Sequence, residues 1–212
     1  MIDRRLYSEF DNGWLPIIEA LYDFDDNLKF NIKILQVKEK FGELRYYTQN
    51  MSQNDESTIR NKVRKFCEVM CNLTCELCGH RGNLALAKKS WYKTVCTACN
   101  RDIGVFVKRK IKESFTDYSQ DFTGWAPLVD AVIYYTKDEN LRDRVFGFKS
   151  FDDKLAVAVN TQELDSENEA VLSAITKICE RASKFICPTC GYIRNSIWDL
   201  DDSTKICNCI TR

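Results

Sequence analysis

Eight of the eleven cysteines in this 212-residue chain fall into two quartets with the spacing of metal sites. The first quartet is Cys75-x2-Cys78-x17-Cys96-x2-Cys99. Two cysteines separated by two residues can reach one ion, and four thiolates at about 2.3 Å complete the closed tetrahedral shell of a structural zinc. A redox pair or an iron–sulfur cluster would not explain a second, matching quartet. We therefore predict a zinc ion at the first quartet.

The second quartet has a looser spacing, Cys187-x2-Cys190-x16-Cys207-x-Cys209. Its last pair is separated by one residue only, which is less usual for a zinc knuckle. The match to the first quartet supplies the argument for a metal here. We predict a second zinc ion, so that each chain carries two structural Zn²⁺ ions.

The remaining cysteines and the single histidine lie close to these quartets. His80 follows Cys78 directly and could replace a thiolate, but with four cysteines available we interpret it as a surface imidazole. Cys67, Cys71 and Cys179 fall on predicted helices. Because a free cysteine behaves as a small apolar residue, we expect these three thiols in the core.

The sequence contains an internal repeat of about 110 residues, the size of a small domain. The segment Gly13–Leu21 returns as Gly124–Val132, and Cys75–Gly79 returns as Cys187–Gly191. We predict a tandem duplication in an α+β fold. Residues 1–111 form the first copy, and residues 112–212 form a second, degenerate copy.

Each copy is predicted as a helix, a β-hairpin, a second helix and a zinc-ribbon or treble-clef-like module. Apolar periodicity separates the helices from the alternating strands. We also expect residues 100–115 to form a helix that links the copies. The expected elements are a helix over 14–28, strands over 30–37 and 44–48 and a helix over 57–73, and then a helix over 125–135, strands over 144–148 and 155–160 and a helix from Asp165 or Ser166 to Phe185.

Composition and charge narrow the class of protein. The chain is 44% hydrophobic and 29% charged, and it has no apolar run of the roughly 20 residues that span a bilayer. No signal peptide is evident, so we expect reduced cysteines and a cytoplasmic protein that is not associated with membranes. Residues 1–111 carry 19 basic and 14 acidic residues, a charge of +5, and residues 112–212 carry 12 and 17, a charge of −5. The halves could attract one another, or the first could favour an anionic partner.

The first copy resembles a group of small, uncharacterised phage-encoded zinc-binding proteins. The motifs that carry the resemblance are Gly13–Ile18, Gln36–Arg45, Cys75–Gly79 and Trp91–Cys96. The match is specific over Gln36–Arg45, and it implies a phage or prophage origin without implying an activity. The second copy keeps the apolar positions, but we align Phe148, Ser150 and Ala156 with the cations Lys38, Lys40 and Arg45.

This difference favours a non-enzymatic binding protein, such as an accessory or counter-defence factor that engages a host protein or an anionic small ligand. Cations beside an aromatic residue can hold a phosphate, and an ordinary solvated strand face is the plain alternative. The expected surface consists of Lys38, Lys40 and Arg45, with Trp91 and Lys93 as the next candidates.

Nucleic-acid binding through the first zinc module is a second possibility. Basic residues near Trp91, Tyr92 and Lys93 could contact phosphates while an aromatic ring stacks on a base. These basic residues are Lys88, Lys89, Lys108, Arg109, Lys110 and Lys112.

An enzyme of the HNH-nuclease type is rejected. Such a site needs an Asp–His pair between the cysteine knuckles. Residues 81–95 contain no histidine and no acidic residue.

Overall fold

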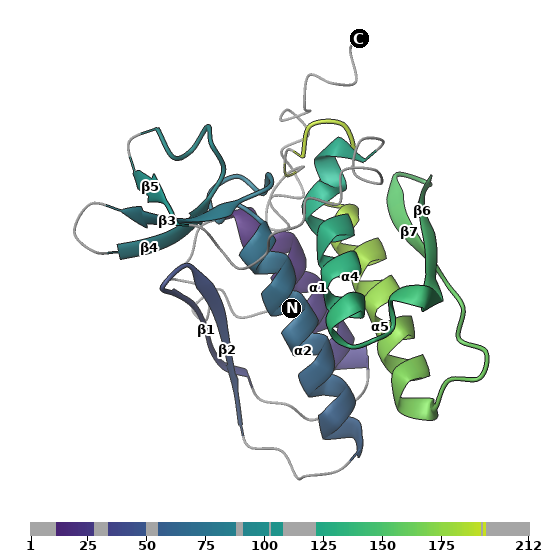
Figure 1. Cartoon of the computed structure of the whole chain (residues 1–212). Coiled ribbons are helices and arrows are strands. Elements are labelled where there is room, and N and C mark those ends of the chain that lie inside the picture. Colours follow the sequence, from purple (N-terminus) through teal and green to yellow (C-terminus); the bar gives the residue numbers. More distant parts are fainter. Residues whose placement is uncertain are drawn as a thin grey trace, which may run out of the picture.

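The computed structural model describes residues 12–27, 34–49, 55–87, 91–101, 103–107, 122–191 and 193. The described residues form an α+β fold with four α-helices and three small antiparallel sheets. In Figure 1 the helices lie together in the centre, with hairpin β1–β2 and hairpin β6–β7 on opposite flanks. The elements are α1 (Leu15–Asn27), β1 (Ile34–Lys40), β2 (Glu43–Thr48), α2 (Asp55–Leu73), β3 (Asn83–Ala87), β4 (Trp91–Val95), β5 (Gly104–Phe106), α4 (Ala126–Asp138), β6 (Val145–Phe151), β7 (Lys154–Val159) and α5 (Ser166–Ser183).

The order of helix, hairpin and long helix occurs once in residues 1–111, the first half, and once in residues 112–212, the second half. Short 3₁₀ turns, Asn12–Trp14 and Thr123–Trp125, precede the first helix of each half. The predicted helices and hairpins are confirmed to within a few residues over the described part of the chain; residue 28 of the first predicted helix and residues 30–33 of the first predicted strand lie outside it. Asp165 caps α5 as expected, because its carboxylate accepts a hydrogen bond from Asn168 N at 2.7 Å. Helix α2 begins at Asp55, two residues before the start that the sequence predicts at residue 57.

Both hairpins turn through two residues that have positive φ. These are Phe41 and Gly42 at 58° and 74°, and Asp152 and Asp153 at 47° and 57°. Positive φ at both central residues is the geometry of a type I′ turn, which fixes the register of the flanking strands. The pairs next to the turns are therefore equivalent in the two hairpins, Lys40↔Glu43 and Phe151↔Lys154.

The predicted linking helix is wrong over its described part. Residues 104–106 form strand β5, which pairs with β3 and completes a three-stranded sheet in the order β4–β3–β5. Val107 N extends the pairing by donating to Leu84 O at 2.8 Å. The β-branched and aromatic run Val105–Val107 suits a strand, and at Gly104 a Cβ atom would come 1.8 Å from Leu86 O. Residues 108–115 lie outside the described residues.

One hydrophobic core runs through both halves. Helix α1 packs on α5 and helix α2 packs on α4, so each half covers helices of the other. Trp14 and Trp125 are fully buried at matching positions. Their indole N–H groups donate to Thr74 O at 2.8 Å and to Ile186 O at 2.9 Å. Both tryptophans are packing residues.

Ion pairs also join the halves. In four of the five described ion pairs the cation belongs to the first half and the acid to the second, which agrees with the opposite net charges of the halves. The ion pairs are Lys62–Glu167 at 2.6 Å, Lys65–Asp138 at 3.0 Å and Lys65–Glu139 at 2.7 Å, Arg81–Asp130, and Arg181–Asp23.

Among the described helices, none is long and apolar enough to cross a membrane.

Candidate metal centre and partner surface

The four cysteines of the first quartet meet at one point. Cys75 and Cys78 lie on the loop between α2 and β3, and Cys96 and Cys99 follow β4. Their Sγ atoms all lie within 4.8 Å of one another, with Cys78 Sγ 3.6 Å from Cys96 Sγ and 3.5 Å from Cys99 Sγ. Four sulfurs at about 2.3 Å from a tetrahedral ion would be about 3.8 Å apart. The quartet therefore has the size of a zinc site.

The backbone shapes each end of this cluster. Gly79 has φ 82°, and its N–H donates to Cys75 O at 2.9 Å, which closes the first knuckle. Cys75 N donates to His80 O at 2.6 Å. In the second knuckle, Cys99 N points at Cys96 Sγ over 3.4 Å. The backbone of the two knuckles thus directs the four sulfurs toward one point.

Two thiols of this cluster, those of Cys75 and Cys99, have raised pKa values and are hard to ionise without a cation. A hydrogen bond to Cys78, together with burial, raises the pKa of the Cys75 thiol. Burial is also the largest cause that raises the pKa of Cys99, to about 11. A divalent ion that binds thiolates would reverse this effect and release protons on binding. With four thiolates the shell is closed, so such an ion would be structural.

The second quartet is described in part. The knuckle Cys187–Gly191 repeats the first knuckle, with φ 72° at Gly191 and a hydrogen bond from Gly191 N to Cys187 O at 2.9 Å. Cys187 is buried, and Cys190 is partly exposed. Cys207 and Cys209 lie outside the described residues, so a pair of cysteines and no second full site is seen in the part of the chain that the structure describes.

The three predicted cations of the first hairpin share one face. Lys38 pairs directly with Arg45 across the strands, and Lys40 pairs with Glu43. Lys38 Nζ lies 5.3 Å from the ring centroid of Tyr47, and Lys40 Nζ lies 5.5 Å from that of Phe41. Arg45 forms an ion pair of 2.8 Å with Glu43. The other hairpin face holds buried residues that pack on α2, namely Val37, Leu44 and Tyr46.

The sequence alignment of the second hairpin was wrong by one residue in its first strand. Lys38 pairs with Arg45, and Lys149 pairs with Ala156, so Lys149 and not Phe148 is the counterpart of Lys38. Both hairpins turn through two residues, so equivalent positions are found by counting outward from the turn. Because successive side chains of a strand point to opposite faces, a shift of one residue would match the outward Lys38 with a residue on the other face. One cation is therefore kept in the second hairpin, while Phe151 replaces Lys40 and Ala156 replaces Arg45.

Trp91 and Lys93 do not extend the hairpin surface. Strand alternation puts both residues on the face of β4 opposite to Thr94. The turn of hairpin β1–β2 packs on the Thr94 face, where Thr94 Oγ1 donates a hydrogen bond to Gly42 O at 2.7 Å. Lys93 Nζ lies 2.5 Å from Glu76 Oε1, a carboxylate that is 2% exposed. Lys93 thus neutralises a buried acid, whereas Trp91 is 59% exposed.

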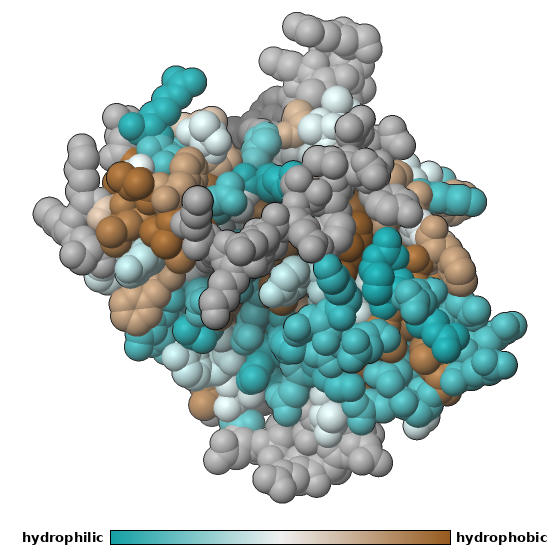
Figure 2. All heavy atoms as spheres, in the orientation of Figure 1, coloured by the Kyte–Doolittle hydropathy of each residue, from teal (hydrophilic) through white to brown (hydrophobic). Residues whose placement is uncertain are grey.

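An apolar patch lies on the small three-stranded sheet. Figure 2 shows hydrophobic residues gathered where Figure 1 places β3, β4 and β5. No sequence pattern marks this patch, because its three strands come together only through the β3–β5 pairing. The patch covers both faces of the sheet: Leu86 and Val105 are paired on one face, and Trp91 and Phe106 project from the other. The exposed apolar residues of the sheet are Leu86, Trp91, Val105, Phe106 and Val107.

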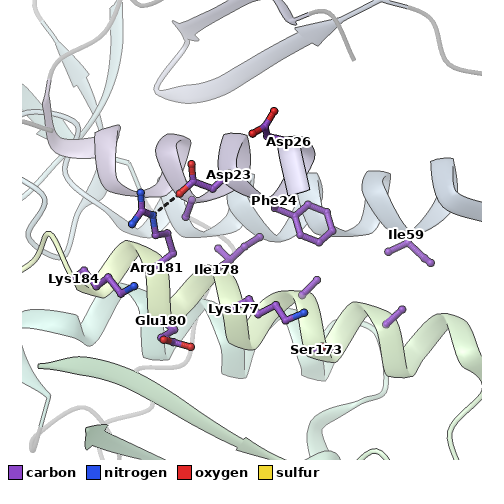
Figure 3. Close-up of a pocket in the computed structure, with 13 residues that line it drawn as sticks. Asp23, Phe24, Asp26, Ile59, Ser173, Lys177, Ile178, Glu180, Arg181 and Lys184 are labelled. Atoms are coloured by element: carbon purple, nitrogen blue, oxygen red, sulfur yellow. Dashed lines mark ion pairs between the residues drawn. The ribbon is translucent and has the colours of Figure 1, made fainter. Parts of the chain in front are cut away.

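A groove of about 860 Å³ runs between α1 and α5, and no sequence signal predicted it. Figure 3 shows Arg181 of α5 reaching Asp23 of α1 at one end, with Phe24 and Ile59 toward the other. Three cations and three acids line the groove, so it carries no net charge that would select an anion. The charged residues are Lys177, Arg181, Lys184, Asp23, Asp26 and Glu180.

Comparison of the chain with protein-family models, with curated proteins and with solved structures gave no match. The molecule therefore has a four-cysteine cluster that could hold a metal, within an α+β fold, and the comparisons assign it to no family.

Proposed function

We propose that the chain is a tandem duplication of one zinc-binding unit and acts as a non-enzymatic binding protein. The duplication is supported by the repeated order of elements, by the two type I′ hairpins and by the matching hydrogen bonds of Trp14 and Trp125. The matching knuckle at Cys187–Gly191 supports a second structural zinc, completed by Cys207 and Cys209.

The binding surface in this proposal is the outward face of hairpin β1–β2, made of Lys38, Lys40 and Arg45. One observation carries it: Lys38 and Lys40 lie over aromatic rings and form no ion pair within the described part of the chain. An ammonium that has no acidic partner can gain a charge-assisted contact on binding. An acidic surface of a host protein or a nucleotide-like anion is the chemistry that this face would recognise.

The closed thiolate shell supports a role for the metal in folding rather than in catalysis, because it leaves no position for substrate. The sequence resemblance to small phage-encoded proteins supports an accessory or counter-defence role in the host cytoplasm. In this proposal the zinc site holds the β3–β4–β5 sheet, and the sheet holds the hairpin through the contact between Thr94 and Gly42.

Nucleic-acid binding through the zinc module is the second candidate. The observation that favours it is the exposed indole of Trp91, which could stack on a base. The basic residues of this reading, Lys88, Lys89 and Lys108–Lys112, lie outside the described residues. Trp91 and the hairpin cations lie on separate surfaces, so variants can distinguish the two candidates.

The test is affinity capture from a bacterial lysate with the full chain immobilised, followed by quantitative mass spectrometry. Three baits are compared: wild type, the triple variant Lys38→Ala/Lys40→Ala/Arg45→Ala, and the control Lys149→Ala, which removes the matching cation of the second half. We expect wild type and control to retain the same protein and the triple variant to lose it. Equal retention by all three baits contradicts the proposed surface.

A parallel titration with ATP and with a single-stranded 20-nucleotide DNA defines the class of partner. The hairpin surface predicts that the triple variant weakens ATP binding and leaves DNA binding alone. Loss of DNA binding in Trp91→Ala, with no effect of the triple variant, would favour the second candidate instead.

A further inference from the structure

The first cysteine knuckle is also a contact between the halves. A Cβ atom added to Gly79 would lie 2.9 Å from Ile193 Cδ1, and one added to Gly191 would lie 3.5 Å from His80 Cδ2. Residues 79 and 80 of the first knuckle therefore lie against residues 191 and 193 of the second. The loop that carries two of the metal-binding thiols is part of the interface between the halves.

Arg81 extends this contact into helix α4. Its backbone is held by the knuckle, through the bridge Thr74↔Arg81 and the neighbouring bond from Cys75 N to His80 O. Its guanidinium forms an ion pair with Asp130, a carboxylate that is 5% exposed. Asp130 lies on α4 of the second half, whereas the position of Arg81 depends on the first knuckle.

The corresponding contact in the other direction, from the second knuckle to α1 of the first half, has no cation. On the offsets of the repeat, Glu19 of α1 corresponds to Asp130, and Ile193 corresponds to Arg81. Glu19 is 6% exposed and forms no ion pair within the described residues, whereas Asp130 forms one with Arg81. An arginine thus reaches from the first knuckle to the second half, while an isoleucine stands at the matching place in the other direction.

From this asymmetry we propose that metal binding at Cys75, Cys78, Cys96 and Cys99 stabilises α4 of the second half through the Arg81–Asp130 ion pair. The proposal rests on the first quartet holding a metal. It adds that the presence of this metal in the first half changes the stability of a helix in the second half. Loss of the ion frees the knuckle, Arg81 moves with it, and Asp130 remains as a buried carboxylate without its cation. Such a charge is costly, so α4 opens more easily.

Hydrogen–deuterium exchange of the full chain during a chelator titration tests this inference. In wild type, peptides from α4 should lose protection at the chelator concentration at which the 75–99 segment loses it. In Asp130→Asn, which removes the buried charge at nearly constant shape, α4 should respond to chelator at least about tenfold less. Because coupling is reciprocal, the same variant should also lose metal from the 75–99 segment at lower chelator, by up to about tenfold.

Arg45→Met is the matched control, because Arg45 is also 41% exposed but pairs within its own hairpin. Arg81→Met should also make α4 insensitive to chelator, but with lower protection of α4 before chelator is added, because Asp130 keeps its buried charge. Arg45→Met should behave as wild type. An α4 that keeps its protection when the 75–99 segment is stripped of metal overturns the inference, as does an unchanged response in Asp130→Asn. Failure of the 75–99 segment itself to respond to chelator would instead contradict the metal site.

Discussion

The two halves build the same part of the core with different chemistry. Beneath the first hairpin, Asp25 and Arg60 form a bidentate ion pair of 2.9 Å, with side chains only 5% and 4% exposed. Tyr46 adds a hydrogen bond of 3.3 Å to Asp25. In the second half, Thr136 stands at the position of Asp25, Leu172 at that of Arg60 and Val157 at that of Tyr46. All three of these residues are buried.

This difference shows that the scaffold does not depend on the ion pair. Taking two charges out of water costs several kcal/mol each, so a buried pair often contributes no more than apolar residues of similar volume. Breaking such a pair is another matter, because one charge remains buried. The halves thus share a fold while differing in which single substitutions they tolerate.

The largest effect is expected on removal of the metal from the first half. A structural zinc can contribute about 10–16 kcal/mol of apparent binding free energy to folding. Strong chelation should therefore unfold the β3–β4–β5 sheet, seen as loss of amide protection over residues 83–106. The hairpin β6–β7, which makes no described contact with this cluster, serves as the internal control and should lose less protection.

The next effect concerns the buried ion pair. Arg60→Leu should lower the free energy of unfolding by about 3–5 kcal/mol, because Asp25 stays buried without a cation. The double variant Asp25→Thr/Arg60→Leu, which installs the residues of the second half, should recover most of that loss. Urea denaturation of the singles and the double gives the coupling energy.

Arg64→Leu is the control for this cycle, because Arg64 lies on the same helix in a partly exposed pair with Glu68. It should change stability by no more than about 1 kcal/mol. A double variant as unstable as Arg60→Leu would show that the halves cannot exchange these residues.

A smaller effect depends on pH and on the buried acids of the interface. Burial, with a smaller contribution from Asp23 and opposed by Arg181, raises the pKa of Glu19 from 4.5 to about 7. The neutral acid therefore contributes stability that is complete below about pH 4.5 and is lost as pH rises through about 7. Glu19→Gln should remove this decline and stabilise the protein by about 2–3 kcal/mol at pH 8, with little change at pH 4.

Thermal denaturation between pH 4 and pH 8 measures this prediction. The exposed Glu169 of α5 offers a control, since Glu169→Gln should leave the pH profile unchanged. A profile for Glu19→Gln that runs parallel to wild type would contradict a raised pKa.

The smallest effect on stability is expected at the two hairpin surfaces. Lys38→Ala and Lys149→Ala each remove an outward cation and should change the free energy of unfolding by within about 0.5 kcal/mol. Their effects on binding should differ, since loss of a charge-assisted contact at Lys38 costs about 1.5–3 kcal/mol and loss of Lys149 costs nothing. Equal effects of the two variants on binding to a captured partner would remove the distinction between the halves.

Local sequence patterns predicted the helices, the hairpins and the first quartet because each depends on neighbouring residues. Apolar periodicity marks α1 and α2, and Phe41–Gly42 marks a turn. Strand β5 was missed because its partner is β3, and because the periodicity of an apolar run as short as Val105–Val107 does not by itself distinguish a strand from a helix. The one-residue slip at Lys149 arose because a type I′ turn at Asp152–Asp153 has no glycine to mark it.

Contacts between the halves have no comparable signal in the sequence. Arg81 and Asp130 meet because α4 docks beside the first knuckle, and nothing near either residue announces the pair. The same holds for the groove between α1 and α5. The opposite net charges of the halves indicated attraction, but they could not say which residues meet.

Counting zinc in half-specific cysteine variants tests the central claim, that the first half is built around a four-thiolate metal site. Elemental analysis is made on wild type, on Cys75→Ser/Cys78→Ser and on Cys187→Ser/Cys190→Ser, all purified with zinc and without chelator. We predict at least one zinc per chain in wild type and a loss of one full equivalent in the first variant. Less than one zinc per chain in wild type, or an unchanged content in Cys75→Ser/Cys78→Ser, would contradict the claim.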